Sequence, residues 1–294
     1  MRMPSLKHIA EYLSHPSNIS GYSGFKRILV RMRRLMSYFV YRIVSKQFVT
    51  ATFHSLGFSL VLPVGYGVVT SLYVLRDDYE PELKLIEPYL TDGIVFVDVG
   101  ANFGFYSVYA SKKVGARGIV LAVEPNPFVS NILRKNTLIN SCENVIIETC
   151  ALSERAGFAT FWIHDQDPWG SSSLVKTSKT PQSNIIVPVR TLDDLVDTYK
   201  INRVHVIKID VEGSELEVIK GARRVFDSSR PVVLMEWSSE RQKQAGHKWN
   251  ELEDILREFK YEMFIADANG LQPVSRSLET QSGKYSVIAL PLKD

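Results

Sequence analysis

The segment Val95–Gly104 joins a short apolar run to the start of a helix pattern through a turn that carries two glycines. The β-branched residues of the run predict a buried strand, and Asp98 lies near its end. In an open α/β sheet, ligands bind in the crevice where the carboxyl end of a strand passes into a helix. Gly100 and Gly104 would allow the backbone to approach such a ligand closely. The segment therefore predicts a strand–turn–helix unit with a small-molecule site at its turn.

This glycine turn does not match the common phosphate-binding loops. Its spacing, Gly100-x-x-x-Gly104, differs from the Gly-x-Gly-x-x-Gly of dinucleotide-binding proteins, and no Lys-Ser/Thr pair follows it. The carboxylate of Asp98 would repel a pyrophosphate but would attract the amino group and the sulfonium of S-adenosylmethionine. These features favour an S-adenosylmethionine site over a dinucleotide-dependent oxidoreductase. The alternative is an ordinary strand–turn–helix that binds nothing.

Strand and helix patterns alternate from Ile94 onward, which is typical of a parallel α/β sheet. The chain has 294 residues and 45% hydrophobic content, enough for a large core. The predicted strands are Ile94–Val99, Ile119–Glu124, Val145–Cys150, Val204–Asp210, Val232–Trp237, Tyr261–Ile265 and Tyr285–Leu290. The predicted helices lie near Phe105–Lys113, Phe128–Ile139, Leu192–Thr198, Ser214–Gly221 and Trp249–Phe259. We assign residues 91–294 to this α/β domain.

The N-terminal part lies outside the regular alternation. Residues 1–25 are predicted to be a loosely structured lead. Residues 26–90 are predicted to form an α+β extension with a basic helix, a strand pair (Phe58–Leu62 and Val68–Leu75) and a helix near Glu80–Leu90.

An insertion interrupts the α/β pattern at about residues 157–189. Its two alternating segments predict an inserted hairpin beside the carboxyl edge of the sheet. The connecting loop contains Asp165, Asp167 and Trp169. We expect a solvated loop, with a substrate lid as the alternative.

The positive charge of the chain is concentrated near its N-terminus. Residues 26–46 hold seven basic residues and no acidic one, whereas the remainder holds 28 basic and 32 acidic residues. Four arginines within Ile28–Val44 argue against a membrane span, because each costs about 2.5–3.5 kcal/mol near a bilayer centre. As a helix, the segment has an apolar stripe made of Ile28, Met32, Leu35, Met36, Phe39 and Ile43. We expect this stripe to pack on the domain; peripheral contact with an anionic membrane is the alternative.

The cysteines, the first 25 residues and the charge of the rest of the chain indicate the cellular compartment and the class of partner. Cys142 and Cys150 are too few for a disulfide framework, and no set of metal-ligand residues surrounds them. The first 25 residues are polar and show no secretory signal. Outside residues 26–46 the chain is net acidic, which argues against a nucleic-acid partner. We therefore expect a cytoplasmic protein without a metal site. It would be associated with a membrane only if the helix of residues 26–46 lies on the membrane surface.

Two further strand ends suit a nucleoside. Glu124 ends the second predicted strand of the domain and is followed by Pro125 and Asn126. An acid at this position, about 20 residues after the glycine turn, can accept hydrogen bonds from ribose hydroxyls. A solvated glutamate is the alternative. The small and apolar Ala151 and Leu152 follow the third predicted strand and suit the edge of an adenine ring.

Acidic residues crowd the end of the fourth predicted strand. Asp210 and Glu212 lie there beside Lys208, and strand alternation places Lys208 and Asp210 on one side. Crowded carboxylates raise the pKa of one member and can supply a general base, or they can hold a cation. Glu236, near the end of the fifth predicted strand, is a candidate substrate contact or second base. Asp210, Glu212 and Glu236 are therefore the candidate catalytic residues.

Together these motifs resemble the FkbM-type family of S-adenosylmethionine-dependent methyltransferases. The stretches that carry the resemblance are Val97–Gly104, Glu124–Asn126, Ala151–Ser153, Val189–Asp193 and Ile207–Glu215. The last of them is the most specific. The resemblance implies an α/β fold with a doubly wound, seven-stranded, mostly parallel sheet of the class I methyltransferase, Rossmann-like type, whose last strand is antiparallel. It also implies methyl transfer to an oxygen nucleophile.

The resemblance further implies roles for individual residues. The methionine part of S-adenosylmethionine would be held by Asp98, Gly100, Ala101, Asn102 and Gly104. The ribose would be held by Glu124 with Pro125 and Asn126, and adenine would lie beside Ala151 and Leu152. Asp210 and Glu212 would face the acceptor, with Asp210 as the base. The acceptor is expected to be a small molecule or glycan with a hydroxyl group, such as a sugar, a glycolipid or a polyketide-like compound. The alternative is a membrane-peripheral binding protein with a degenerate methyltransferase fold.

Overall fold

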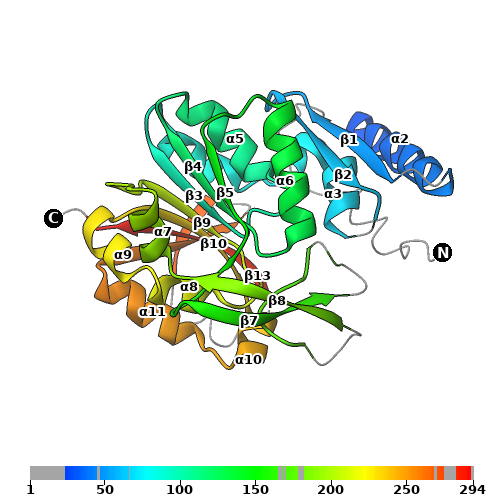
Figure 1. Cartoon of the computed structure of the whole chain (residues 1–294). Coiled ribbons are helices and arrows are strands. Elements are labelled where there is room, and N and C mark those ends of the chain that lie inside the picture. The colour runs from blue at the N-terminus through cyan, green and yellow to red at the C-terminus, as the bar shows by residue number, and fades with distance from the viewer. Residues whose placement is uncertain are drawn as a thin grey trace.

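The computed structural model describes residues 24–44, 47–65, 67–164, 168, 170–177, 182–267, 270–274 and 283–292. Within these residues, eight strands form a central sheet in the order β12-β11-β13-β10-β9-β3-β4-β5 (Figure 1). The strands are β3 (Val95–Val99), β4 (Ile119–Val123), β5 (Val145–Glu148), β9 (Val206–Ile209), β10 (Val232–Ser238), β11 (Tyr261–Asp267), β12 (Gly270–Pro273) and β13 (Lys284–Pro291). β13 is antiparallel to both of its neighbours, whereas β5, β4, β3, β9 and β10 run parallel. The expected fold class is confirmed, and β12 extends the seven predicted strands by an eighth at the edge.

Helices cover both faces of this sheet. They are α5 (Phe105–Val114), α6 (Pro127–Ile139), α7 (Leu192–Thr198), α8 (Glu215–Lys220), α9 (Arg223–Ser229), α10 (Ser239–Ala245) and α11 (Trp249–Glu258), of which α9 and α10 are additional to the predicted helices. α5 and α6 lie on one face, and α7, α8, α9 and α11 lie on the other (Figure 1). Neighbouring residues of β3 accordingly enter different cores: Val97 packs on the α7 side and Phe96 on the α5 side.

The N-terminal extension packs on the face that α5 and α6 cover. Its elements are α2 (Gly24–Ile43), β1 (Phe48–Phe53), β2 (Phe58–Pro63), α3 (Val68–Leu75), α4 (Leu83–Ile86) and the 3-10 turns Arg76–Asp78 and Glu87–Tyr89. The predicted pairing of Phe58–Leu62 with Val68–Leu75 is wrong, because β2 pairs with β1 and the second run is the helix α3. Six of the eight side chains of α3 are buried, and a short run that is buried on most sides has no periodicity to separate a helix from a strand. The helix predicted near Glu80–Leu90 is likewise reduced to α4 and one 3-10 turn.

Helix α2 packs against α3 with its basic side, opposite to the expectation. Arg31 forms an ion pair of 2.8 Å with Asp78, and both side chains are almost fully buried. A buried charge must remain paired, so this pair fixes which side of α2 faces inward. Leu35 of the predicted apolar stripe is buried, but four other members are exposed, namely Ile28, Met32, Met36 and Ile43. None of the helices in the described part of the chain is long and apolar enough to cross a bilayer.

Two asparagine side chains, one in α6 and one directly after it, pair with the backbone of β2 in the way that a neighbouring strand would. The side chain of Asn136 accepts a hydrogen bond from Val61 N (2.7 Å) and donates one to Val61 O (3.1 Å). One helical turn later, Asn140 makes the same two bonds with Ser59. Asn136 also donates to Phe103 O (2.8 Å), in the glycine turn after β3. These bonds fasten the N-terminal extension to the turn.

The insertion forms a small separate sheet together with two residues that precede it. Its strands are β6 (Ala151–Leu152), β7 (Gly157–His164) and β8 (Gln182–Arg190), in the order β6-β8-β7. β7 and β8 are antiparallel, so the predicted hairpin is confirmed. The predicted third strand of the domain ends early, at Glu148, because Ala151 and Leu152 pair with β8 instead. The loop residues Asp165, Asp167 and Trp169 lie outside the described residues.

Replacing Asn136 by alanine is expected to lower the free energy of unfolding by roughly 2–4 kcal/mol, because buried backbone groups lose their partners at about 1–3 kcal/mol each. Urea denaturation measures this loss. Leu138→Ala on the same helix is the control, since Leu138 is 77% exposed; its effect should stay within about 0.5 kcal/mol. Equal losses in the two variants would contradict the role given to Asn136.

Candidate active site

Acidic residues mark the carboxyl ends of four neighbouring strands, at one edge of the central sheet. Asp98 lies on β3, Glu124 directly after β4, Asp210 directly after β9 and Glu236 on β10. Three cavities meet this edge, and Asp210 lines all of them. The carboxylate of Asp210 therefore lies where the three cavities meet.

We name the cavities by their positions. The β4 cavity is bounded by the glycine turn, the end of β4 and the insertion, and it has a volume of about 70 Å³. The β10 cavity has a volume of about 370 Å³ and lies between the ends of β9 and β10, β13 and the N-terminal extension. The bridging cavity adjoins both and is also lined by α3.

The glycine turn is packed directly against the end of β9. A Cβ atom at Gly100 would lie 1.9 Å from the carbonyl oxygen of Asp210, and one at Gly104 would lie 2.4 Å from Leu133 Cδ1. Gly100, Asn102 and Gly104 also have φ of 75°, 50° and 90°, which favours glycine and asparagine. Gly100 and Asn102 line the β4 cavity and Ala101 the bridging cavity, whereas Gly104 lines none of the three.

Asp98 lies beneath the turn rather than in a cavity wall. Its side chain is fully buried, and Ser107 Oγ donates a hydrogen bond to it (2.6 Å). It lines none of the three cavities. Burial raises the pKa of Asp98, and the ammonium of Lys208, 3.7 Å away, opposes this effect.

Lys208 connects the turn, Asp98 and Asp210. Its Nζ donates to Gly100 O (3.1 Å) and lies 3.3 Å from Asp210 Oδ2, so Lys208 and Asp210, which strand alternation places on one side, form an ion pair. The ammonium also lies 5.3 Å from the centre of the Tyr106 ring. Although burial opposes the charge, Asp210 and Asp98 raise the pKa of Lys208. Lys208 therefore stays protonated and neutralises two carboxylates.

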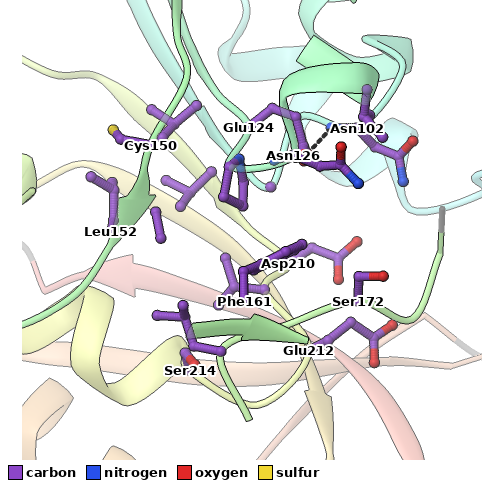
Figure 2. A pocket seen from close by; sticks show the side chains of 18 of the residues that line it. Asn102, Glu124, Asn126, Cys150, Leu152, Phe161, Ser172, Asp210, Glu212 and Ser214 are labelled. Atoms are coloured by element: carbon purple, nitrogen blue, oxygen red, sulfur yellow. Dashed lines mark hydrogen bonds between the residues drawn. The ribbon is translucent and has the colours of Figure 1, made fainter. Parts of the chain in front are cut away.

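Glu124 is held by backbone donors in the wall of the β4 cavity. Its two carboxylate oxygens accept hydrogen bonds from Asn102 N (3.0 Å) and Asn126 N (2.9 Å). Burial raises the pKa of Glu124 to about 7, although both hydrogen bonds favour the charged form. The other expected nucleoside contacts line the same cavity, namely Pro125, Asn126, Ala151 and Leu152. Figure 2 shows Glu124 and Asn126 on one wall and Asp210 and Glu212 on the other.

The three predicted catalytic residues lie together. Oxygen atoms of Asp210, Glu212 and Glu236 lie within 4.8 Å of one another. Lys284 on β13 contacts Glu236 (2.5 Å) and Glu212 (3.5 Å), and Arg241 contacts Glu212 (3.1 Å). Two cationic side chains therefore already compensate the charge of this cluster.

The cluster contains carboxyl groups of different basicity. Burial and the charge of Asp210 raise the pKa of Glu236 to about 7. Burial acts in the same direction on Asp210, but Lys208 and Lys284 outweigh it and hold the pKa of Asp210 below its usual value. At neutral pH Asp210 is thus charged, and Glu236 can gain or release a proton.

Several residues of the β10 cavity were not predicted. Glu80, from the N-terminal extension, accepts a hydrogen bond from Tyr106 Oη (3.2 Å), and burial raises the pKa of Glu80 to about 8. Lys284 reaches the cavity from the last strand. No local motif marks these residues. Only the topology could have indicated Lys284, because β13 pairs with β10 and brings Lys284 beside Glu236.

The insertion closes the β4 cavity on the side opposite the glycine turn. Its wall residues are Phe161, Pro168, Gly170, Ser172 and Leu174. Ser171 O accepts a hydrogen bond from the Arg241 guanidinium, which also contacts Glu212. This contact links the insertion to the acidic cluster.

Replacing Lys208 by methionine is expected to lower the free energy of unfolding by about 3–5 kcal/mol, because the buried carboxylate of Asp98 and the partly buried carboxylate of Asp210 lose their cation. Lys113→Met is the matched control. Lys113 pairs with Glu87 on the surface, where both side chains are more than 40% exposed, so its loss should cost about 0–1 kcal/mol. In urea denaturation, a Lys208→Met variant as stable as the control would contradict the central place of this lysine.

Comparison with known proteins identifies the family of the chain. The profile described as "Methyltransferase FkbM domain" matches residues 98–263, more than half of the chain. Methyltransferase sdnD of Sordaria araneosa is 29% identical, and the match covers 48% of this chain and 65% of that protein. The hexuronic acid methyltransferase AglP of Haloferax volcanii is also 29% identical, over 54% of this chain and 62% of that protein.

These curated relatives are matched over less than two thirds of their own length. Among solved structures, methyltransferase FkbM from Methylobacillus flagellatus KT aligns with a TM-score of 0.42 and 19% identity, over 75% of this chain and 54% of that one.

The match to the FkbM domain contains the glycine turn, Glu124, Asp210 and Glu236. The chain therefore belongs to the FkbM family of S-adenosylmethionine-dependent methyltransferases.

Proposed function

We propose that this protein transfers the methyl group of S-adenosylmethionine to a hydroxyl oxygen of a sugar, glycolipid or polyketide-like acceptor. The observation that carries the proposal is the position of Asp210, which lines the β4 cavity and the β10 cavity at once. A methyl donor in the first cavity and an acceptor in the second would meet at this residue.

The β4 cavity suits the methyl donor. Each oxygen of the buried Glu124 carboxylate accepts one backbone hydrogen bond, which leaves further lone pairs for two ribose hydroxyls. Ala151 and Leu152 offer an apolar border for adenine, and Gly100 and Asn102 border the methionine part. When bound, S-adenosylmethionine supplies an activated methyl group on sulfur. Asp98, which lines none of the cavities, contributes indirectly by fixing Lys208 beneath the turn.

The acidic cluster suits the acceptor side of the reaction. The charged Asp210 accepts a hydrogen bond from the acceptor hydroxyl, takes its proton as the methyl group is transferred, and passes the proton on to Glu236, whose pKa is raised to about 7 by burial and by Asp210. The acceptor O–H bond and the donor S–CH₃ bond break, the O–CH₃ bond forms, and S-adenosylhomocysteine leaves. Alignment of the reacting atoms can supply about 7–11 kcal/mol of the barrier reduction. Lys284 holds Glu236 and Glu212 in place.

The lining of the β10 cavity favours a neutral, hydroxyl-rich acceptor. Four carboxyl groups (Glu80, Glu82, Asp210 and Glu236) face two ammonium groups (Lys208 and Lys284). The name of the Haloferax relative supports a sugar as acceptor, although the acidic lining of the β10 cavity would repel the carboxylate of a uronic acid. The alternative considered above is a membrane-peripheral protein without catalytic activity. Such a protein does not require carboxyl groups of different basicity between two cavities.

Two measurements test the proposed function. Isothermal titration calorimetry with S-adenosylhomocysteine tests the donor site, and release of S-adenosylhomocysteine from S-adenosylmethionine tests transfer to neutral glycosides, uronates and glycolipids. Donor binding with release in the presence of a hydroxyl acceptor is the expected result. Absence of S-adenosylhomocysteine binding would overturn the donor assignment, and transfer to nitrogen or carboxylate acceptors alone would overturn the acceptor assignment.

The affinity for S-adenosylhomocysteine is expected to rise as the pH increases through about 7, where burial places the pKa of Glu124. Below this pH the folded protein holds the proton, and the neutral carboxyl is a weaker acceptor for ribose hydroxyls. Calorimetry on either side of this pH measures the change. A Glu124→Gln variant should bind more weakly and without this pH dependence, and an unchanged pH profile in that variant would remove Glu124 from the ribose site.

Asp210→Asn is expected to lower kcat by about 10²–10⁴-fold, which is the usual range for loss of a group that takes part in proton transfer. Binding of S-adenosylhomocysteine should change little, because the substitution preserves the size of the side chain. Asp254→Asn on the exposed side of α11 is the matched control. Full turnover in Asp210→Asn, with the first acceptor found, would exclude Asp210 from the reaction.

A further inference from the structure

We propose that helix α2 docks on an anionic lipid surface through its apolar face. This face consists of Phe25, Ile28, Leu29, Met32, Met36, Val40 and Ile43, all of which are exposed. Contiguous exposed apolar patches on soluble proteins mark interaction sites with proteins or membranes. The proposal concerns binding and does not depend on the methyl acceptor.

The contacts of α2 with the domain force this face outward. Arg31 is paired with Asp78 in the interior, and Tyr38 Oη donates to Gly65 O (2.7 Å). The Arg34 guanidinium donates to Val74 O (3.1 Å), near the C-terminal end of α3, where carbonyl oxygens lack helical partners. The inner side of α2 is therefore the polar one. Burial of the apolar side on the domain would break all three contacts.

The charge of α2 indicates an anionic partner. The helix carries six basic residues and no acidic one, although Arg31 is paired with Asp78 in the interior and Arg34 is bonded to α3 on the inner side. Lys26 and Arg33 are exposed beside the apolar face. Basic residues that flank an apolar helix face are typical of helices that lie in the headgroup region of anionic membranes. A second copy of the chain would instead bring two cationic helices together, which opposes self-association through this face.

The length and position of α2 suit a surface contact. Its 20 residues span about 30 Å at 1.5 Å per residue, and the helix does not qualify as a bilayer span. In Figure 1, α2 lies at the outer edge of the molecule, beyond β1 and β2. Among the described residues, α2 therefore lies away from the central sheet (Figure 1).

The docking surface lies close to the proposed acceptor side. Helix α3 packs on α2 and also lines the bridging cavity with Val68, Ser71 and Leu72. A lipid surface on the outer face of α2 would thus be separated from this cavity by α2 and α3, or about 20 Å at a helix diameter of about 10 Å. If the proposed function holds, on which this step rests, the arrangement favours a lipid-linked acceptor over a free sugar.

The test is co-sedimentation of the full chain with vesicles of phosphatidylcholine, with and without phosphatidylglycerol. The variant Met36→Glu/Ile43→Glu places two acids on the apolar face, where the parent side chains are 67% and 72% exposed. Phe158→Glu, on β7 and 78% exposed in the parent, is the matched control. Binding of S-adenosylhomocysteine and circular dichroism verify that each variant is folded.

The wild type and Phe158→Glu are expected to bind vesicles that contain phosphatidylglycerol, more weakly at high salt, and Met36→Glu/Ile43→Glu to bind at least about tenfold more weakly. The proposal is overturned by absence of wild-type binding or by equal binding of the double variant. It is also overturned if sedimentation without lipid shows a dimer that the double variant abolishes. Because none of these readings uses methyl transfer, failure here is distinct from failure of the proposed function.

Discussion

A buried lysine holds the functional edge of the sheet together. Lys208 Nζ lies 3.7 Å from Asp98 and 3.3 Å from Asp210, and it donates to the carbonyl of Gly100. Without this cation, desolvation and mutual repulsion would oppose ionisation of both carboxylates. The lysine thereby ties the turn after β3 to the end of β9. The charged state of Asp210, and with it the difference in basicity between Asp210 and Glu236, depends on this arrangement.

The two sides of the proposed reaction are built from different parts of the chain. The β4 cavity is lined by the strand ends and the insertion, which all lie within the segment matched to the FkbM domain. The β10 cavity takes Glu80 from the N-terminal extension and Lys284 from the last strand, both outside that segment. Ser286 on β13 also donates to Glu82 (2.9 Å), which joins these two outer parts. Acceptor recognition is therefore where this chain is expected to differ from its relatives.

The sequence predicted the regular half of the molecule well, because buried parallel strands and glycine turns leave strong local patterns. It placed the seven strands and the inserted hairpin, and it put Lys208 and Asp210 on the same side of their strand. It failed where tertiary contacts override local pattern. The apolar run Val68–Leu75 became a helix, and the apolar stripe of α2 turned outward because Arg31 pairs with Asp78. Glu80 was not found because only the folding of the extension brings it to the acidic cluster.

The contact between Gly100 and the carbonyl oxygen of Asp210 leaves no room even for a methyl group between two strand ends. Chains packed this closely cannot slide past one another without loss of the backbone contacts, so the centre of the site behaves as one rigid body. Entry of reactants and departure of products must then use the outer walls, formed by the insertion and the N-terminal extension. Alignment of the reacting atoms depends on the sheet, whereas ligand exchange depends on segments that belong to none of its strands.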